Sequence, residues 1–130
     1  MAGEKNIDNL LRGLSPALNE GEYVFCTIPD HKEIQVSTIA TMKEQEGMSM
    51  VINRIDADKL GLEYESVFSW ITLQIHSSLD AVGLTAVCSK ALAERGIPCN
   101  MVAGFYHDHL FVPKGQAQVA METLKAVSKK

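Results

Sequence analysis

Hydrophobic and polar positions at the start of the chain change from a helical to a strand-like pattern. Four apolar residues recur at helical spacing within the segment 4–14, namely Ile7, Leu10, Leu11 and Leu14. This spacing predicts a short amphipathic helix. The helix should end before Pro16, because the residue that precedes a proline is disfavoured in the α region. After a turn at residues 19–22, the apolar run 23–28 is typical of a buried strand.

The next part of the chain predicts two further strands and a short helix. Residues 29–36 carry no regular pattern, and we expect them to form a loop. Segments 36–42 and 48–53 flank a polar stretch that ends in glycine, so they predict a hairpin with a longer loop. Residues 55–60 have room for only a short helix, which Gly61 should end.

The second half of the chain has stronger periodicity and predicts five elements. They are a strand at residues 68–75, a helix at 83–95, a hairpin of strands at 100–106 and 109–113, and a helix at 117–127. Apolar residues alternate along the first strand, and they recur at i, i+3 and i+4 in both helices. Gly96 should end the first helix, since Pro98 follows it closely.

The order of these elements predicts an α+β fold. Residues 68–128 follow the order strand, helix, strand, strand, helix, which matches a ferredoxin-like βαββαβ unit whose last strand is unassigned. The first half repeats this order in degraded form, with its first helix shrunken or absent. We therefore expect two tandem units, residues 1–66 and 67–130, that share antiparallel sheets with helices on one face.

Composition narrows the classes of function. Twelve Lys and Arg against 16 Asp and Glu give a net charge of −4, which argues against a nucleic-acid partner. No apolar run is long enough to span a membrane, and the first residues lack the apolar core of a secretory signal. The three cysteines are an odd number without CxxC spacing, and they predict buried thiols in a reducing, cytoplasmic compartment.

Two stretches of the second half resemble the ACT domain family. Residues 75–87 run from the end of a strand through a D-x-x-G turn into a helix. Asp80 and Gly83 fall on the acidic and glycine positions of that family. In the stretch 92–102, the run Arg95-Gly96-Ile97 falls on its step from helix to strand. Over nearly its whole length, the chain is similar to small stand-alone bacterial proteins built from two tandem ACT-like units.

The resemblance implies a fold, a class of function and a partner. ACT domains are ferredoxin-like, and they usually bind a small effector, most often an amino acid, near the glycine turn. They also pair through their sheets or helices, which implies a homodimer or a higher homo-oligomer here. The resemblance therefore implies a regulatory, ligand-sensing protein that is not an enzyme and needs no cofactor. Val82 stands where many ACT sequences have proline.

The glycine turn also has a physical case as a binding site. The first N–H groups of a helix have no internal partners and attract a carboxylate, and Gly83 allows a close approach. Backbone N–H groups from Gly83 to Thr85 would hold the carboxylate of an amino acid, and Asp80 or Ser78 its ammonium group. Asn100, Tyr106 or His107 would meet its side chain. The expected ligand-binding residues are Ser77, Ser78, Asp80, Val82, Gly83, Leu84, Thr85, Asn100, Tyr106 and His107.

Other interpretations of the same residues remain open. Ser77-Ser78-Leu79-Asp80 also fits a capping box, or Asp80 alone caps the helix. His107 and His109 share a strand face and would bind a metal only with a third ligand such as Asp108 or His76, which would make a small metal-dependent enzyme. A further alternative is a structural or protein-interaction module with a vestigial site. The cysteines are expected to be core residues rather than nucleophiles.

Overall fold

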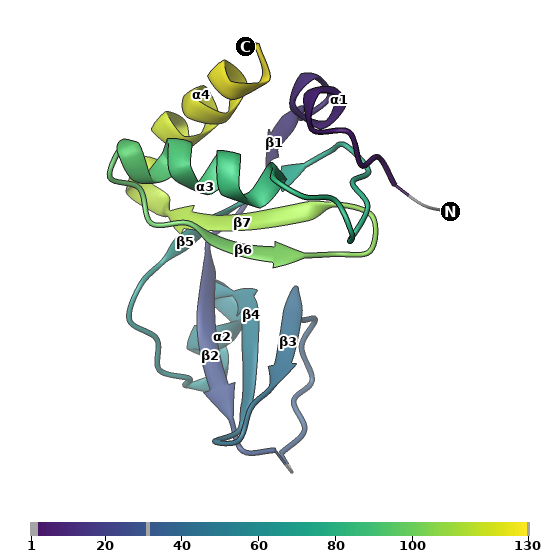
Figure 1. The fold of residues 1–130 in the computed structure, drawn as a ribbon. Coiled ribbons are helices and arrows are strands. Elements are labelled where there is room, and N and C mark those ends of the chain that lie inside the picture. The colour runs from purple at the N-terminus through teal and green to yellow at the C-terminus, as the bar shows by residue number, and fades with distance from the viewer. Residues whose placement is uncertain (1–2, 31, 130) are drawn as a thin grey trace. The chain divides into compact units, whose positions relative to one another are not determined.

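A computed structural model describes residues 3–30 and 32–129 (Figure 1), which divide into two compact units. The larger unit combines the described part of residues 1–20 with that of residues 69–130, and the smaller unit comprises residues 21–68. The predicted division at residues 66 and 67 differs from these units, because the N-terminal segment packs with the second half of the chain. No helix among the described residues is long and apolar enough to cross a membrane.

The larger unit is a four-stranded sheet with helices packed against it (Figure 1). Its elements are α1 (Ile7–Arg12), β1 (Pro16–Leu18), β5 (Phe68–Leu73), α3 (Leu84–Glu94), β6 (Asn100–Ala103), β7 (Asp108–Pro113), the 3₁₀ turn η1 (Lys114–Gln116) and α4 (Ala117–Ser128). The strand order is β1-β5-β7-β6. With β1 counted as the fourth strand, this is the 4-1-3-2 order of a ferredoxin-like unit. The N-terminal segment therefore supplies the strand that the second half lacks.

Strand β1 was not expected from the sequence. Its three residues pair antiparallel with β5, from Pro16 opposite Leu73 to Leu18 opposite Ile71. Three residues are too few to show an alternation of apolar and polar side chains. The segment is a strand because it pairs with β5. The expected helices at 4–14, 83–95 and 117–127, and the hairpin after residue 100, are confirmed with small changes at their ends.

The core of the larger unit lies between one face of the sheet and the helices. Its fully buried members come from α1 and the residues after it, from β5 and β7, and from α3 and α4: Leu10, Leu14, Ile71, Leu73, Cys88, Leu92, Leu110, Val112, Ala120 and Leu124. Alternate residues of β5 and β7 take part, so both long helices cover the same sheet face. The predicted α+β fold with helices on one face is confirmed.

The described residues of the smaller unit, 21–30 and 32–68, form three strands and one short helix besides the first residue of β5. Strands β2 (Tyr23–Ile28) and β3 (Ala40–Lys43) lie on either side of β4 (Met48–Asn53), and both pair with it antiparallel. Helix α2 (Arg54–Leu60) follows β4 and ends at Gly61, whose φ of 69° is left-handed. Between β2 and β3, the described residues 29–30 and 32–39 form no helix, as the sequence predicted. The core of the unit is Val24, Cys26, Ile28, Met50, Ile52 and Ala57.

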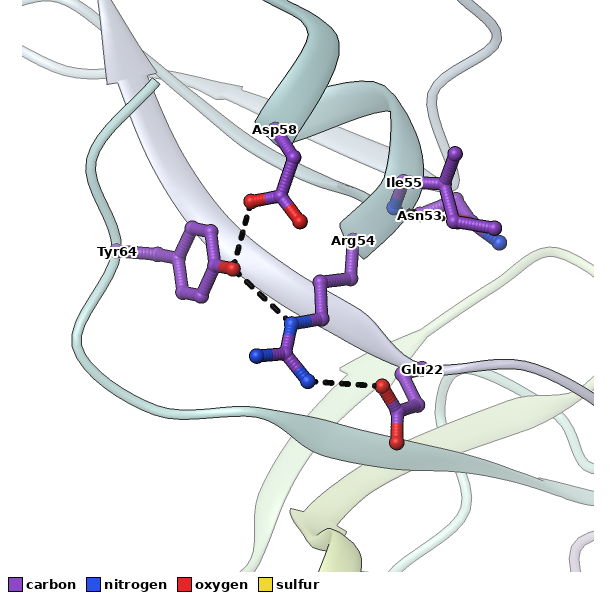
Figure 2. A network of polar contacts seen from close by, with 6 residues as sticks. All are labelled: Glu22, Asn53, Arg54, Ile55, Asp58 and Tyr64. Atoms are coloured by element: carbon purple, nitrogen blue, oxygen red, sulfur yellow. Dashed lines mark hydrogen bonds and ion pairs between the residues drawn. The ribbon is translucent and has the colours of Figure 1, made fainter. Parts of the chain in front are cut away.

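A polar network in the smaller unit connects helix α2 with the chain segments before β2 and after α2 (Figure 2). The Arg54 guanidinium pairs with Glu22 at 3.0 Å and donates from Nε to the hydroxyl of Tyr64, also at 3.0 Å. That hydroxyl donates in turn to Asp58 at 2.7 Å. The bond to Tyr64, followed by that to Glu22, raises the pKa of Arg54, which stays positively charged. The network ties the loop after α2 to the start of β2.

Candidate functional site

The turn between β5 and α3 ends at Gly83, which directly precedes the first residue of the helix. Its φ of 109° is a conformation that side-chain-bearing residues rarely adopt, which explains the glycine. Gly83 is the N-cap of α3, and its carbonyl accepts the first intrahelical bond, from Val87 at 2.9 Å. No side chain of the described residues caps this end. The interpretation of Ser77 or Asp80 as the helix cap is therefore wrong.

The two serines of the turn have different roles. Ser77 is buried, and its hydroxyl donates to a carboxylate oxygen of Asp108 at 2.9 Å, which anchors the turn to the start of β7. The hydroxyl of Ser78 accepts the backbone N–H of Asp80 at 3.1 Å and shapes the turn locally. The Asp80 side chain is exposed. Of the polar groups expected here, Asp80 is thus available to a ligand and Ser77 is not.

Removing the Ser77 anchor should weaken the fold measurably. We expect Ser77→Ala to lower the free energy of unfolding by about 1–3 kcal/mol, because the bond to a partly buried carboxylate is lost. Ser78→Ala is the matched control, since its hydroxyl accepts only one backbone N–H at an exposed position. Urea unfolding of the two variants measures the difference. Equal losses would show that the contact between Ser77 and Asp108 carries no special weight.

The N-terminal segment lies directly against this turn. Glu4 donates its backbone N–H to the carbonyl of His76 at 2.8 Å and accepts from Ser78 N at 2.9 Å, as an isolated parallel bridge. A Cβ on Gly3 would lie 2.5 Å from the carbonyl carbon of Ser77, so this close approach requires glycine. Sequence reasoning did not associate these residues with the site, because no pattern in residues 3–6 indicates a distant backbone partner.

The side chain of Ile7, in α1, packs beside Gly83. Its Cδ1 atom lies 3.4 Å from the position that a Cβ of Gly83 would take, which is ordinary van der Waals contact. Leu84 is buried, whereas Thr85 is exposed and its hydroxyl donates to the sulfur of Met101 at 3.3 Å. Val82 is 84% exposed. The start of α3 is therefore packed on the side of Ile7 and open on the side of Val82 and Thr85.

The tip of the hairpin between β6 and β7 reaches the same region. The ring of Tyr106, which is 64% exposed, lies 5.7 Å from the ring of His76. His107 Nδ1 lies 3.4 Å from the carbonyl oxygen of Ile75, two residues after the end of β5. Tyr106 and His107 therefore come beside the turn, as the sequence predicted.

Asn100 is not brought to the turn. It lies opposite Phe111 in the hairpin, and the tip pair is Ala103 with Asp108. Three residues of strand, about 10 Å, separate it from that tip. Its side-chain amide donates to the carbonyl of Phe111 at 3.3 Å, so its position is structural.

The structure gives little support to a metal site or to a reactive cysteine. No three His, Cys, Asp or Glu side chains come together as a metal site within residues 3–30 and 32–129. His109 Nδ1 instead contacts Trp70 Nε1 and Thr72 Oγ1, both at 3.0 Å. Burial raises the pKa of Cys88 to about 12, so this thiol stays protonated, as expected of a core residue.

Comparison with known protein families identifies the family of the chain. A model of the ACT domain matches residues 2–69, and a second ACT domain model matches residues 65–126. The chain belongs to the ACT domain family. The expectation of two tandem ACT-type domains is therefore confirmed. The glycine turn falls within the second match, and ACT domains typically bind amino acid effectors in regulatory roles.

Solved structures of bacterial proteins share this fold. A protein of unknown function from Vibrio cholerae, described as a possible transport protein, is 43% identical with a TM-score of 0.84, over 98% of this chain and 99% of that one. A protein from Agrobacterium tumefaciens is 18% identical, with a TM-score of 0.71 and 87% of each chain covered.

The regulatory subunit of aspartate kinase from Thermus thermophilus shares the fold. It is 12% identical, with a TM-score of 0.61, over 86% of this chain and 95% of that one. At such low identity the likeness concerns the fold alone. No protein of curated function matches the chain.

Proposed function

We propose that this ACT protein is a regulatory protein without catalytic activity that binds an amino acid at the turn between β5 and α3. The observation that carries the proposal is the start of α3 at Gly83, which no side chain of the described residues caps and which follows the exposed Asp80 by three residues. A helix N-terminus attracts a carboxylate, and a carboxylate attracts an ammonium group. An amino acid carries both charges.

The roles of individual residues follow from their contacts. The backbone N–H groups of Leu84 and Thr85 would receive the carboxylate of the effector, and Asp80 its ammonium group. Tyr106 and His107, at the hairpin tip, would contact its side chain. Ser77 and Ser78 would position the turn, because their hydroxyls already serve it.

A thermal-shift screen with the common amino acids tests the proposal. At 100 times its Kd, a ligand that binds only the folded protein adds about 2.7 kcal/mol of stability. We expect at least one amino acid to raise the melting temperature at millimolar concentration. If none does so, the proposal is contradicted.

We further propose a homodimer or higher homo-oligomer in the cytoplasm. Strand β6 lies at the end of the sheet of the larger unit, and its residues Asn100–Ala103 carry no charge that would discourage pairing with another strand. All three cysteines are free, which suits a reducing compartment. Light scattering coupled to size exclusion measures the mass, and a monomer at every concentration would contradict the oligomer.

One observation favours an interaction module as a second candidate function. Large apolar side chains are exposed on the turn and on the neighbouring hairpin tip, namely Leu79, Val82, Phe105 and Tyr106. Clustered exposed apolar residues often mark protein interfaces. This function would show a stoichiometric protein complex that Leu79→Asp and Phe105→Asp weaken, together with no response to any amino acid.

A further inference from the structure

A polar cluster lies on the sheet face of the larger unit that points away from its helices. Trp70 and Thr72 alternate along β5 with core residues, and His109 on β7 precedes the buried Leu110. The indole N–H of Trp70 donates to His109 Nδ1 at 3.0 Å. Thr72 Oγ1 lies 3.0 Å from the same nitrogen and accepts from the amide of Asn19 at 3.0 Å. Two strands and the segment after β1 thus meet at one imidazole nitrogen.

The chemistry of these donors determines the protonation of His109. An indole N–H can only donate, so Nδ1 must offer a lone pair. Thr72 Oγ1 accepts a hydrogen bond from the amide of Asn19, so its own hydroxyl hydrogen can share the Nδ1 lone pair with the indole. The cluster therefore selects the neutral ring with its proton on Nε2. A protonated Nδ1 would bring two N–H groups face to face, and the bond from Trp70 would break.

We propose that His109 is an acid-sensitive latch of the larger unit, which holds Trp70 when neutral and releases the indole when protonated. The latch is connected to the turn through the preceding residue, because Asp108 receives the hydrogen bond from Ser77. Release of Trp70 is therefore expected to shift the start of β7 and, with it, the turn. Any effect on an effector rests on the proposed function above, whereas the latch itself does not.

The surroundings of His109 determine the pH range of the latch. Trp70, Thr72 and Asn19 do not titrate, Glu20 follows Asn19 in the chain, and the hairpin contributes His107 and Asp108. Burial lowers the pKa of His109, the positive charge of His107 lowers it further, and Asp108 opposes both. The transition should therefore lie below the ordinary value of about 6.5.

The sign for stability follows from this direction. The folded protein binds fewer protons at His109 than the unfolded chain does, so the contribution to stability is complete above about pH 6.5. It is lost as the pH falls from there toward the pKa of the folded state. Acid release of Trp70 should therefore be centred at the lowered folded-state pKa, at the acid end of the range over which stability is lost.

The indole N–H resonance of the ligand-free protein tests the latch directly. The chain contains one tryptophan, so this resonance is unambiguous. Between pH 7.5 and 5 we expect it to move with a single transition, and the amide resonances of Ser77 and Gly83 to follow with the same midpoint. His109→Gln should abolish the transition of the indole. His107→Gln is the matched control, which should keep the transition and move it to higher pH.

A second measurement does not depend on any variant. The ¹⁵N shifts of the His109 ring in the wild-type protein at pH 7.5 should show the tautomer with hydrogen on Nε2. Hydrogen on Nδ1, or an indole transition that persists in His109→Gln, would overturn the latch. An indole transition without movement of Ser77 and Gly83 would overturn its connection to the turn. Because no amino acid is added, these results are independent of whether the protein binds an effector.

Discussion

Replacing both Leu10 and Leu14 with alanine is expected to unfold the larger unit. Both side chains are 0% exposed, and they pack in one core with Ile71, Leu73 and residues of α3 and α4. Truncating a buried leucine to alanine costs about 2–5 kcal/mol, and a whole domain is stable by only about 5–15 kcal/mol. Two such losses should therefore remove most of the stability of the unit, although both residues lie in the first 20 of the chain.

Urea unfolding followed by tryptophan fluorescence measures this loss, because Trp70 belongs to the larger unit. Leu18→Ala is the matched control, since Leu18 lies in the same N-terminal segment but is 45% exposed. Its effect should be below about 1 kcal/mol. An unchanged midpoint for the double variant would mean that the N-terminal segment is not part of this core.

Replacing Gly83 with alanine is expected to abolish the stabilisation by an amino acid effector while the fold is kept. At a φ of 109°, a side chain costs about 1–3 kcal/mol of backbone strain. The new Cβ would lie 3.4 Å from Ile7, which is ordinary van der Waals contact, so the alanine side chain causes no clash and the chain can still fold. Relief of the strain should turn the first N–H groups of α3 away from the effector carboxylate. The shift in melting temperature measures binding, and far-UV circular dichroism measures the fold.

The other end of the same helix supplies the control for this experiment. Gly96 follows α3, has a φ of 69°, and would place a Cβ in open space. Gly96→Ala should therefore lower the melting temperature through similar backbone strain and keep the full response to the effector. A full response in Gly83→Ala would show that the effector does not bind at the start of α3.

The regular elements were predictable where periodicity is strong. Helix α3 and helix α4 follow apolar stripes whose buried members include Leu84, Cys88 and Leu124. Strand β5 follows an alternating pattern, with Ile71 and Leu73 buried. In these segments the burial of one face decides the local conformation, so the pattern of side chains is sufficient.

The candidate site was predictable only in part. Tyr106 and His107 were expected beside the turn, and they contact His76 and Ile75, which precede its serines. The anchoring role of Ser77 was missed, because its partner Asp108 lies 31 residues away in the sequence. The expected contact of Asn100 with the effector is not supported. The sequence does not show which end of β6 lies near the turn, and Asn100 stands at the end away from the hairpin tip.

The sequence by itself determined the α+β class and the position of most helices and strands, because these depend on local spacing of apolar residues and on glycines in turns. The family follows from the match of the chain to two ACT domain models. The tertiary structure alone decided that Pro16–Leu18 forms a strand against β5, that Gly3, Glu4 and Ile7 contact the turn, and that His109 accepts the indole N–H of Trp70. Each of these contacts joins residues far apart in the chain. Their energy comes from pairing and burial against a partner, which no local pattern specifies.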